Sequence, residues 1–326
     1  MKILLFHPFG SELSNDWNHR LKRQIELMSQ RCDLRVLGLK YSDNDWLGRI
    51  KNAIKEFNPD VVYVNGYMVA YEVLKVFDKV VYDMGSWKSR NILIDEGRIT
   101  YKEMRKMNIG ELRKEINRWG PDEFQREDYV LKKAKAIIIW ESEEAEFVEK
   151  IHEVKVNQIS MMFYDLPEPI RWEDKEKRII AISAKWRDRQ KNHRLITHLN
   201  GSDTLKGYSI YSVGRSDNSD CFVEHSKLMD RVNKLRVVFC PYFCGGIGVI
   251  NEGLKLGCNV IVGDWHPYLT YINDSMIISS RGNVKENAKE CIMRALESYY
   301  PPKKELPSEE EQLNKIIKTC EQVVSR

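Results

Sequence analysis

The chain has 326 residues, about twice the roughly 150 residues of a typical domain, so we expect two domains. Apolar residues make up 42% of the sequence, and 18 Gly and 10 Pro are too few for a collagen-like or low-complexity chain. The 52 Lys and Arg against 48 Asp and Glu leave a net charge of +4, which argues against a dedicated nucleic-acid binder.

The first apolar run ends early, at His7-Pro8, and therefore predicts a buried strand rather than a signal peptide. No run approaches the roughly 18 apolar residues that span a bilayer. The seven cysteines are odd in number and lack paired CxxC spacing, so a reducing compartment fits them best. We expect Cys240, Cys244 and Cys258 to be buried small residues rather than metal ligands. The protein is therefore expected to be cytoplasmic.

Short apolar runs alternate with longer amphipathic stretches in the first half, a pattern typical of βαβ units and a parallel sheet. A helix over Trp46–Phe57 lies between the second and third strands, as a right-handed crossover requires. The predicted strands of this half are Lys2–Phe6, Leu34–Leu39, Val61–Asn65, Val80–Asp83 and Ala136–Trp140.

Residues 88–135 interrupt this alternation. Asn108 and Glu111 have capping-box spacing, and Gly120-Pro121 ends one helix and begins the next. The segment is also basic and aromatic. Two interpretations remain open: an ordinary pair of helices packed on the sheet, or an element that contacts a membrane surface or an acceptor.

The second half begins after Leu166-Pro-Glu-Pro169, where a charged stretch precedes a new strand and predicts a domain boundary near residue 170. A second βαβ series follows, with strands Ile179–Ser183, Tyr208–Val213, Val237–Pro241 and Asn259–Val262. In the tail, Ser308 and Glu311 have capping-box spacing and begin a helix with one apolar stripe. The predicted domains are 1–170 and 171–307, followed by a C-terminal helix over 308–326.

Ligands of open α/β sheets bind beyond the carboxyl ends of the strands. The strand that ends at Pro241 leads into Gly245-Gly-Ile-Gly248 and then into a helix. Free backbone N–H groups at such a helix start suit a phosphate or sugar hydroxyls, and Glu252 in the helix can accept hydrogen bonds from a ribose. The spacing is neither a dinucleotide fingerprint nor a P-loop. A turn of this kind can also serve close packing alone.

A cluster of cations follows the strand Ile179–Ser183. Arg is suited to forked contacts with phosphate and Lys to point-charge contacts, so the cluster suggests a diphosphate site. The alternative is a solvated charged run. We favour the diphosphate site because the cluster follows a buried strand in the same half as the Gly-rich turn. Its members are Lys185, Arg187, Arg189 and Lys191.

Polar residues also lie at strand ends of the first half. Asp83 and Asn65 each end a predicted strand, and Gly10-Ser11 follows the first one. An acidic residue there can orient a substrate hydroxyl or act on developing charge, while a structural turn cap is an equal alternative. The seven His show no HxxxH or HExxH pairing, so no metal site is expected.

The stretch from Val238 to Val262 resembles the donor-site signature of GT-B glycosyltransferases of the GT4 type. That family has a strand ending in Pro-Ser, then Glu-Gly-Phe-Gly, a second Glu after seven residues, and Gly-Thr-Pro-Val-Val. Residues 179–192 are similar to the family's Gly-Arg…Lys segment. The resemblance implies a GT-B fold: two Rossmann-like, doubly wound parallel-sheet domains facing a central cleft. It also implies that 308–326 returns to the first domain.

The resemblance assigns roles on the donor side. Glu252 matches the Glu that holds the nucleotide ribose, and Lys191 matches the Lys that binds the diphosphate. Arg187 is nearest to the family's Arg, with Lys185 and Arg189 as alternatives. The donor sugar would meet the amides of the turn, at Gly245, Gly246, Ile247 and Gly248.

Two further positions bear on the reaction. Cys244 stands where the family has its first Glu and keeps the spacing to Glu252, so it removes a carboxylate expected near the donor sugar. Asp83 falls near the position where the family has a His or Asp close to the acceptor. Lys191 and Arg187 would stabilise charge on the departing diphosphate, and Asn65, Gly10 and Ser11 would lie on the acceptor side.

The resemblance therefore implies a retaining hexosyltransferase that uses a UDP or GDP sugar without a metal or other cofactor. The acceptor would be a glycan, lipid or protein, with peripheral contact to the inner membrane face through 88–135. Two alternatives stay open. The loss of carboxylate at Cys244 fits a non-catalytic sugar-nucleotide-binding protein, and the fold also suits a sugar-nucleotide epimerase, although no convincing acid–base pair is found.

Overall fold

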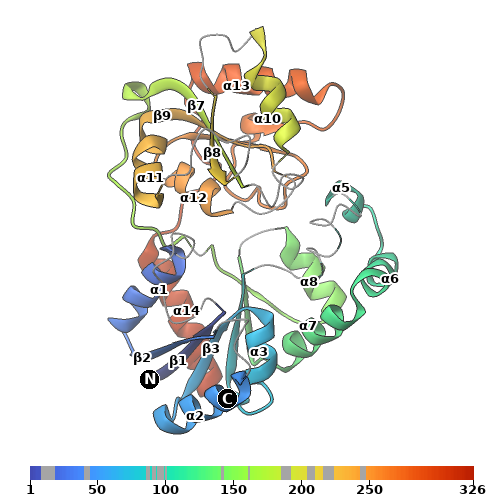
Figure 1. The fold of residues 1–326 in the computed structure, drawn as a ribbon, viewed down its shortest axis with the longest axis vertical. Coiled ribbons are helices and arrows are strands. Elements are labelled where there is room, and N and C mark those ends of the chain that lie inside the picture. The colour runs from blue at the N-terminus through green and yellow to red at the C-terminus, as the bar shows by residue number, and fades with distance from the viewer. Residues whose placement is uncertain are drawn as a thin grey trace. The chain divides into compact units, whose positions relative to one another are not determined.

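The computed structural model describes residues 1–8, 19–39, 45–85, 89, 93, 99, 101–140, 143–160, 162–184, 192–203, 210–215, 224–242 and 247–326. The chain forms two compact units (Figure 1). Unit 1 contains Met1–Leu93, Met107–Phe163 and Pro307–Arg326, and unit 2 contains Ile94–Lys106 and Tyr164–Leu306. Each unit is built on one parallel sheet with helices, so the predicted fold class is confirmed.

The sheet of unit 1 has six parallel strands in the order β2-β1-β3-β4-β5-β6. Its central strands are buried along almost their whole length, which explains why they are continuous apolar runs in the sequence. The predicted strands are all present, with ends shifted by one residue at most. The strands are β1 (Lys2–His7), β2 (Asp33–Gly38), β3 (Val61–Asn65), β4 (Val80–Met84), β5 (Ala136–Ile139) and the short β6 (Asn157–Gln158).

The helices of unit 1 cover this sheet. Helix α14 contacts β3, β4 and β5 and packs beside α1, while α3 contacts β3 and β4 and packs against α2 and α7. The helices are α1 (His19–Ser29), α2 (Trp46–Phe57), α3 (Tyr67–Val73), α6 (Ile109–Trp119), α7 (Pro121–Lys133), α8 (Glu144–His152) and α14 (Glu309–Val324). Thus the last helix of the chain belongs to unit 1, although the whole of β7 to α13 precedes it.

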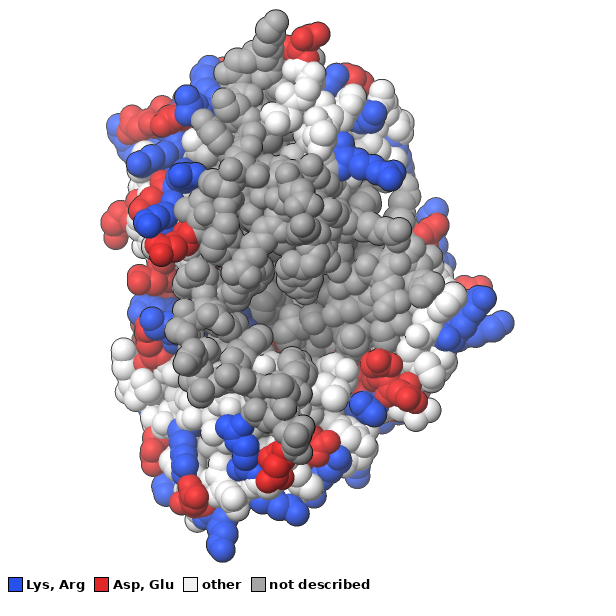
Figure 2. All heavy atoms as spheres, viewed as in Figure 1, with Lys and Arg blue, Asp and Glu red and all other residues white. Residues whose placement is uncertain are grey.

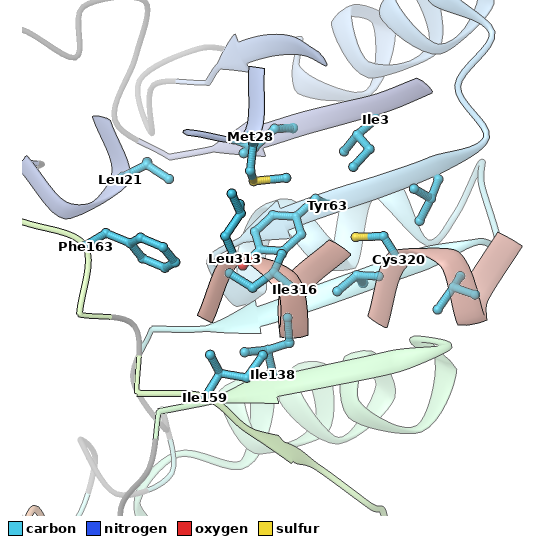
Figure 3. Close-up of a cluster of buried hydrophobic side chains, with 14 residues drawn as sticks. Ile3, Leu21, Met28, Tyr63, Ile138, Ile159, Phe163, Leu313, Ile316 and Cys320 are labelled. Carbon is cyan, nitrogen blue, oxygen red and sulfur yellow. The ribbon is translucent and has the colours of Figure 1, made fainter. Parts of the chain in front are cut away.

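One apolar cluster joins the sheet of unit 1 to α1 and α14 (Figure 3). Tyr63 and Ile138 of the sheet meet Leu21 of α1 and the α14 residues Leu313 and Ile316, all with 3% or less of their surface exposed. Burial of such side chains stabilises the fold by about 1.5–3 kcal/mol each. The amphipathic stripe predicted for the tail is therefore a structural part of unit 1.

Polar contacts hold both ends of α14 in place. At its start, Ser308 and Glu311 form the predicted capping box, and the Arg23 guanidinium of α1 lies 2.9 Å from the Glu309 carboxylate. At its end, Lys79 Nζ donates to the Val324 carbonyl at 2.9 Å, which places a cation at the negative end of the helix dipole.

The sheet of unit 2 has five parallel strands in the order β11-β10-β9-β7-β8. Helix α13 contacts β7, β9 and β10, and α11 and α12 contact β9 and each other. The strands are β7 (Glu176–Ala184), β8 (Ile210–Arg215), β9 (Leu235–Cys240), β10 (Asn259–Gly263) and β11 (Ile277–Ile278). The helices are α5 (Tyr101–Met104), α10 (His193–Asn200), α11 (His225–Lys234), α12 (Ile247–Lys255) and α13 (Val284–Glu297), with 3-10 turns at Trp172–Asp174 and Asp274–Met276.

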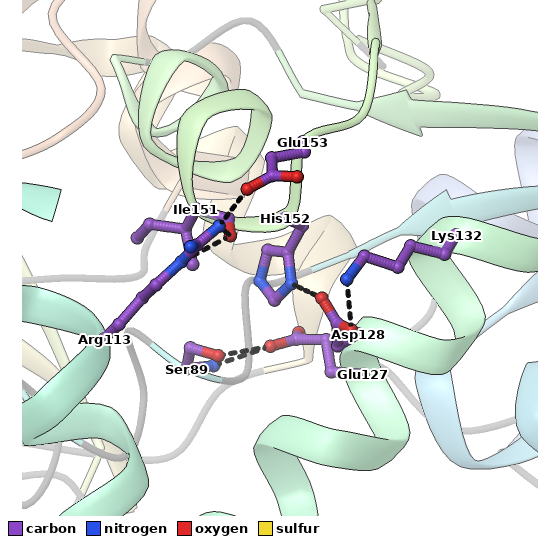
Figure 4. A network of polar contacts seen from close by, with 8 residues as sticks. All are labelled: Ser89, Arg113, Glu127, Asp128, Lys132, Ile151, His152 and Glu153. Atoms are coloured by element: carbon purple, nitrogen blue, oxygen red, sulfur yellow. Dashed lines mark hydrogen bonds and ion pairs between the residues drawn. The ribbon is translucent and has the colours of Figure 1, made fainter. Parts of the chain in front are cut away.

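A polar network joins α6, α7 and α8 (Figure 4). The buried His152 ring lies 2.9 Å from Asp128, which also pairs with Lys132, and burial lowers the pKa of His152. The Glu127 carboxylate is fully buried and accepts hydrogen bonds from the backbone and hydroxyl of Ser89. These contacts hold α7 in place within unit 1.

The surface carries both signs of charge. On the face shown in Figure 2, the basic and acidic side chains of the described residues are interspersed around its margin. Among the described helices, none combines the length and the apolar composition needed to cross a bilayer.

We predict that Ile316→Ala lowers the free energy of unfolding of unit 1 by about 2–5 kcal/mol, because it opens a cavity between α14 and the sheet. Urea denaturation measures this change. Lys318→Ala, exposed on the same helix, is the matched control and should shift stability by less than about 0.5 kcal/mol. Equal effects of the two substitutions would mean that α14 does not stabilise unit 1.

Candidate functional site

In unit 2, a buried carboxylate lies on the helix that follows the Gly-rich turn. Glu252 is the sixth residue of α12 and only 6% exposed, and its Oε1 lies 2.7 Å from Nε2 of His225. His225 is the first residue of α11. His225 carries no signal in the sequence, because the two residues are 27 positions apart and only the packing of α11 against α12 brings them together.

Helix α12 is held very close to the sheet. A Cβ atom at Gly253 would come within 2.9 Å of Val260 Cγ2 and 3.0 Å of Val238 Cγ2, so only glycine permits this approach. The helix backbone is therefore fixed against β9 and β10, and the position of Glu252 relative to the strand ends is fixed with it.

The loops around α12 are tied together by buried hydrogen bonds. Tyr268 Oη donates to Asn251 Oδ1 at 2.7 Å, and the Trp265 indole donates to the Tyr242 carbonyl at 2.9 Å. Asp264 accepts from the backbone N–H and hydroxyl of Ser280, at 3.0 and 2.9 Å. Asp264 therefore connects the end of β10 with the chain after β11.

Most of the donor-side residues proposed from the sequence lie outside the described residues. Ile247 and Gly248 are the first two residues of α12, and a Cβ at Gly248 would be in ordinary contact with Tyr164 Oη, at 3.5 Å. The roles of the others stay predictions. They are Lys185, Arg187, Arg189, Lys191, Cys244, Gly245 and Gly246.

In unit 1, the carboxyl edge of the sheet carries a row of polar residues. Asn65 of β3 pairs in register with Asp83 of β4, and Phe6 pairs with Val64, so His7 lies beside Asn65 on the next strand. All three are buried, with 6% exposure or less. Gly10 and Ser11, also predicted on this side, lie outside the described residues.

Asp83 is the centre of this row. Its Oδ2 accepts hydrogen bonds from Tyr63 Oη at 3.0 Å and Asn65 Nδ2 at 3.1 Å, and the Arg20 guanidinium lies 3.6 Å away. Burial, and then the charge of Asp83, raise the pKa of Tyr63 well above its ordinary value, so its hydroxyl stays protonated and donates. The structure thus brings together two residues selected from the sequence and adds Tyr63.

Arg20 and Gln24 extend this network from α1. Gln24 donates to Tyr63 Oη at 3.0 Å and accepts from Arg20 Nη1 at 3.3 Å. The Arg20 guanidinium also lies over the Trp140 ring, 4.6 Å from its centroid, a cation–π arrangement. The period-2 alternation of β3 places Tyr63 on the same face as Asn65 and could have revealed it, whereas Arg20 and Gln24 carry no comparable signal.

His7 is nearly fully buried, and burial lowers its pKa to about 4, so the ring is neutral at pH 7. In the part of the chain that the structure describes, no three His, Cys, Asp or Glu side chains are grouped as a metal site.

Comparisons with known proteins give the fold. No protein-family model and no curated protein sequence matches the chain. Among solved structures, a sucrose-phosphate synthase from Thermosynechococcus elongatus is similar with a TM-score of 0.64 and 10% identity, over 100% of this chain and 94% of that one. A UDP-N-acetylglucosamine 2-epimerase from Rickettsia bellii gives 0.55 and 10%, over 100% and 97%.

The lipopolysaccharide outer core galactosyltransferase WaaB is also similar, with a TM-score of 0.54 and 9% identity over 99% of both chains. At such identities the similarity shows the fold alone. The chain has two parallel-sheet α/β domains that match those of GT-B proteins, a fold shared by glycosyltransferases and UDP-N-acetylglucosamine 2-epimerases.

We predict that His7 makes stability depend on pH. Its folded pKa of about 4 lies below the ordinary 6.5, so its stabilising contribution is complete above pH 6.5 and is lost as the pH falls towards 4. The substitution His7→Gln should flatten the dependence of the unfolding free energy on pH between pH 7 and 4, as measured by urea denaturation. His198→Gln, on the exposed side of α10, is the control. Identical pH slopes in His7→Gln and the unmodified protein would contradict the assignment.

Proposed function

We propose that the protein is a glycosyltransferase that moves a hexose from a UDP or GDP sugar to an acceptor hydroxyl. The observation that carries this proposal is the buried Glu252 carboxylate on α12, which follows β9 at the carboxyl edge of the unit 2 sheet in a GT-B fold. Its position matches the ribose-binding Glu of the signature. Retention of configuration and independence from metals and other cofactors are parts of the proposal that rest on the resemblance.

On the donor side, His225 Nε2 lies 2.7 Å from Oε1 of Glu252 and so restrains the carboxylate. The second carboxylate oxygen can then accept a hydrogen bond from a ribose hydroxyl. A hydrogen bond to an ionised carboxylate is about twice as strong as a neutral one. Lys191 and Arg187 would stabilise the charge that develops on the departing diphosphate. The amides of Gly245 to Gly248 would meet the sugar.

On the acceptor side, we assign unit 1, where Asp83 and Asn65 share a hydrogen bond at the carboxyl edge of the sheet. The acceptor is a glycan, lipid or protein. Peripheral contact with the inner membrane face through 88–135, in a cytoplasmic protein, is part of the same proposal. It is supported by Trp119, which is 39% exposed at the end of α6 with the Arg118 guanidinium 4.8 Å from its ring centroid.

Binding of the donor gives the first test. Thermal shift with UDP, GDP and ADP should show a raised midpoint for at least one of them, because a ligand of the folded state stabilises it by mass action. Glu252→Gln should weaken this binding about tenfold, the loss expected for one charge-assisted hydrogen bond. Glu290→Gln, exposed on α13, should bind as the unmodified protein does. A chain that binds none of the three nucleotides would refute the proposal.

Product analysis separates the proposal from its two alternatives. A glycosyltransferase releases nucleoside diphosphate from a UDP or GDP hexose in proportion to the glycoside formed. Conversion of UDP-N-acetylglucosamine to its C2 epimer would instead identify an epimerase, which the shared fold also allows. A non-catalytic binding protein would remain inert even after Cys244→Glu restores the carboxylate of the signature.

A further inference from the structure

We propose that the acceptor of unit 1 is an uncharged sugar whose hydroxyls bind the Asp83 cluster, an inference that rests on the proposed glycosyl transfer. The Asp83 cluster consists of Arg20, Gln24, Tyr63, Asn65, Asp83 and Trp140, all within unit 1.

The two Asp83 oxygens differ in their hydrogen bonding. Oδ2 accepts from Tyr63 and Asn65 and faces Arg20, whereas Oδ1 is buried without a hydrogen-bond partner among the described residues. An unsatisfied buried polar atom costs about 1–3 kcal/mol. Three groups on Oδ2 hold the carboxylate in one orientation, so the free oxygen is in a fixed position to accept a hydrogen bond from a ligand.

Hydrogen-bond donors belong to the same cluster, where the Arg20 guanidinium lies 3.6 Å from Asp83 Oδ2 and over the Trp140 ring. The indole Nε1 of Trp140 is also buried and has no partner within the described part of the chain. The polar contacts that Arg20 makes there, with Asp83 and Gln24, both use Nη1. Asp83 Oδ1 can accept a hydrogen bond, and the Trp140 indole and the Arg20 guanidinium can donate one. Together they complement a ligand group that both donates and accepts, as a hydroxyl does.

The charges of the cluster balance. Arg20 and Asp83 cancel each other, the neighbouring His7 is neutral at pH 7, and the buried Tyr63 hydroxyl is protonated. A phosphate or carboxylate ligand would place a second acceptor against the free Asp83 oxygen, and like charges in a buried setting repel. The cluster therefore favours a neutral polyhydroxyl group, that is, a sugar without phosphate or uronic acid.

Among the charged residues of the cluster, Arg20 has the more exposed side chain. Asp83 is fully buried, whereas the Arg20 side chain is 13% exposed and packs on Trp140. A ligand hydroxyl would thus enter along the Arg20 side chain. An ion pair that served only to attach α1 to the sheet would affect stability and would have no influence on which sugars bind.

The test is binding of the full-length protein to a glycan array that contains neutral glycans beside their phosphorylated and uronic acid counterparts. The unmodified protein should bind neutral glycans in preference to charged ones. Asp83→Asn leaves Arg20 without its counter-charge, so it should lose at least about tenfold in binding to neutral glycans, as expected for a charged hydrogen bond, and shift its preference towards anionic ones. Arg20→Gln should weaken neutral binding without that shift.

Asp60→Asn, an exposed carboxylate of the same unit, is the matched control and should leave the neutral-to-anionic ratio as it is. Circular dichroism and UDP calorimetry on each variant establish that the protein is folded. Three outcomes would each overturn the inference. The unmodified protein could prefer anionic glycans, it could bind no glycan, or Asp83→Asn could leave the neutral-to-anionic binding ratio unaltered. If UDP binds normally in those cases, the proposed donor chemistry stands and only the acceptor assignment fails.

Discussion

Burying a carboxylate is costly, and this protein buries Asp83 near the end of β4 in unit 1 and Glu252 on α12, the helix that follows β9, in unit 2. Asp83 is completely buried and Glu252 is 6% exposed. A buried carboxylate is stabilised when nearby hydrogen-bond donors replace the water that it has lost. Asp83 has Tyr63, Asn65 and Arg20, while Glu252 has His225. Both carboxylates are fixed in position by these partners before any ligand arrives.

One packing feature in each unit helps to position these carboxylates. In unit 1, α14 closes the apolar cluster behind Tyr63, so the final helix supports the strand that carries both Tyr63 and Asn65. In unit 2, Gly253 lets α12 approach the sheet closely, which fixes Glu252 one residue earlier in the same helix. Under the proposed function, Glu252 would orient the donor and Asp83 the acceptor, and oriented reactants lose less entropy at the transition state.

The fold was largely predictable from the sequence because buried parallel strands are continuous apolar runs. The strands β6 and β11 escaped prediction since each has only two residues. Helix α3 was missed because it begins directly after Gly66, without a side-chain cap. For the candidate site, strand ends predicted Asn65 and Asp83 and a signature predicted Glu252, and their roles stay predictions. The partners Arg20, Gln24 and His225 come from other helices, and only tertiary packing brings them to these carboxylates.

The most direct test of the account is a crystal structure of the protein with UDP. We expect the ribose hydroxyls to lie about 2.5–3.2 Å from the Glu252 carboxylate, the range of ordinary hydrogen bonds, with His225 still on the other oxygen. Two results would contradict the assignment of unit 2 as the donor-binding domain. UDP would bind away from α12, or the Glu252 carboxylate would contact His225 but no part of the nucleotide.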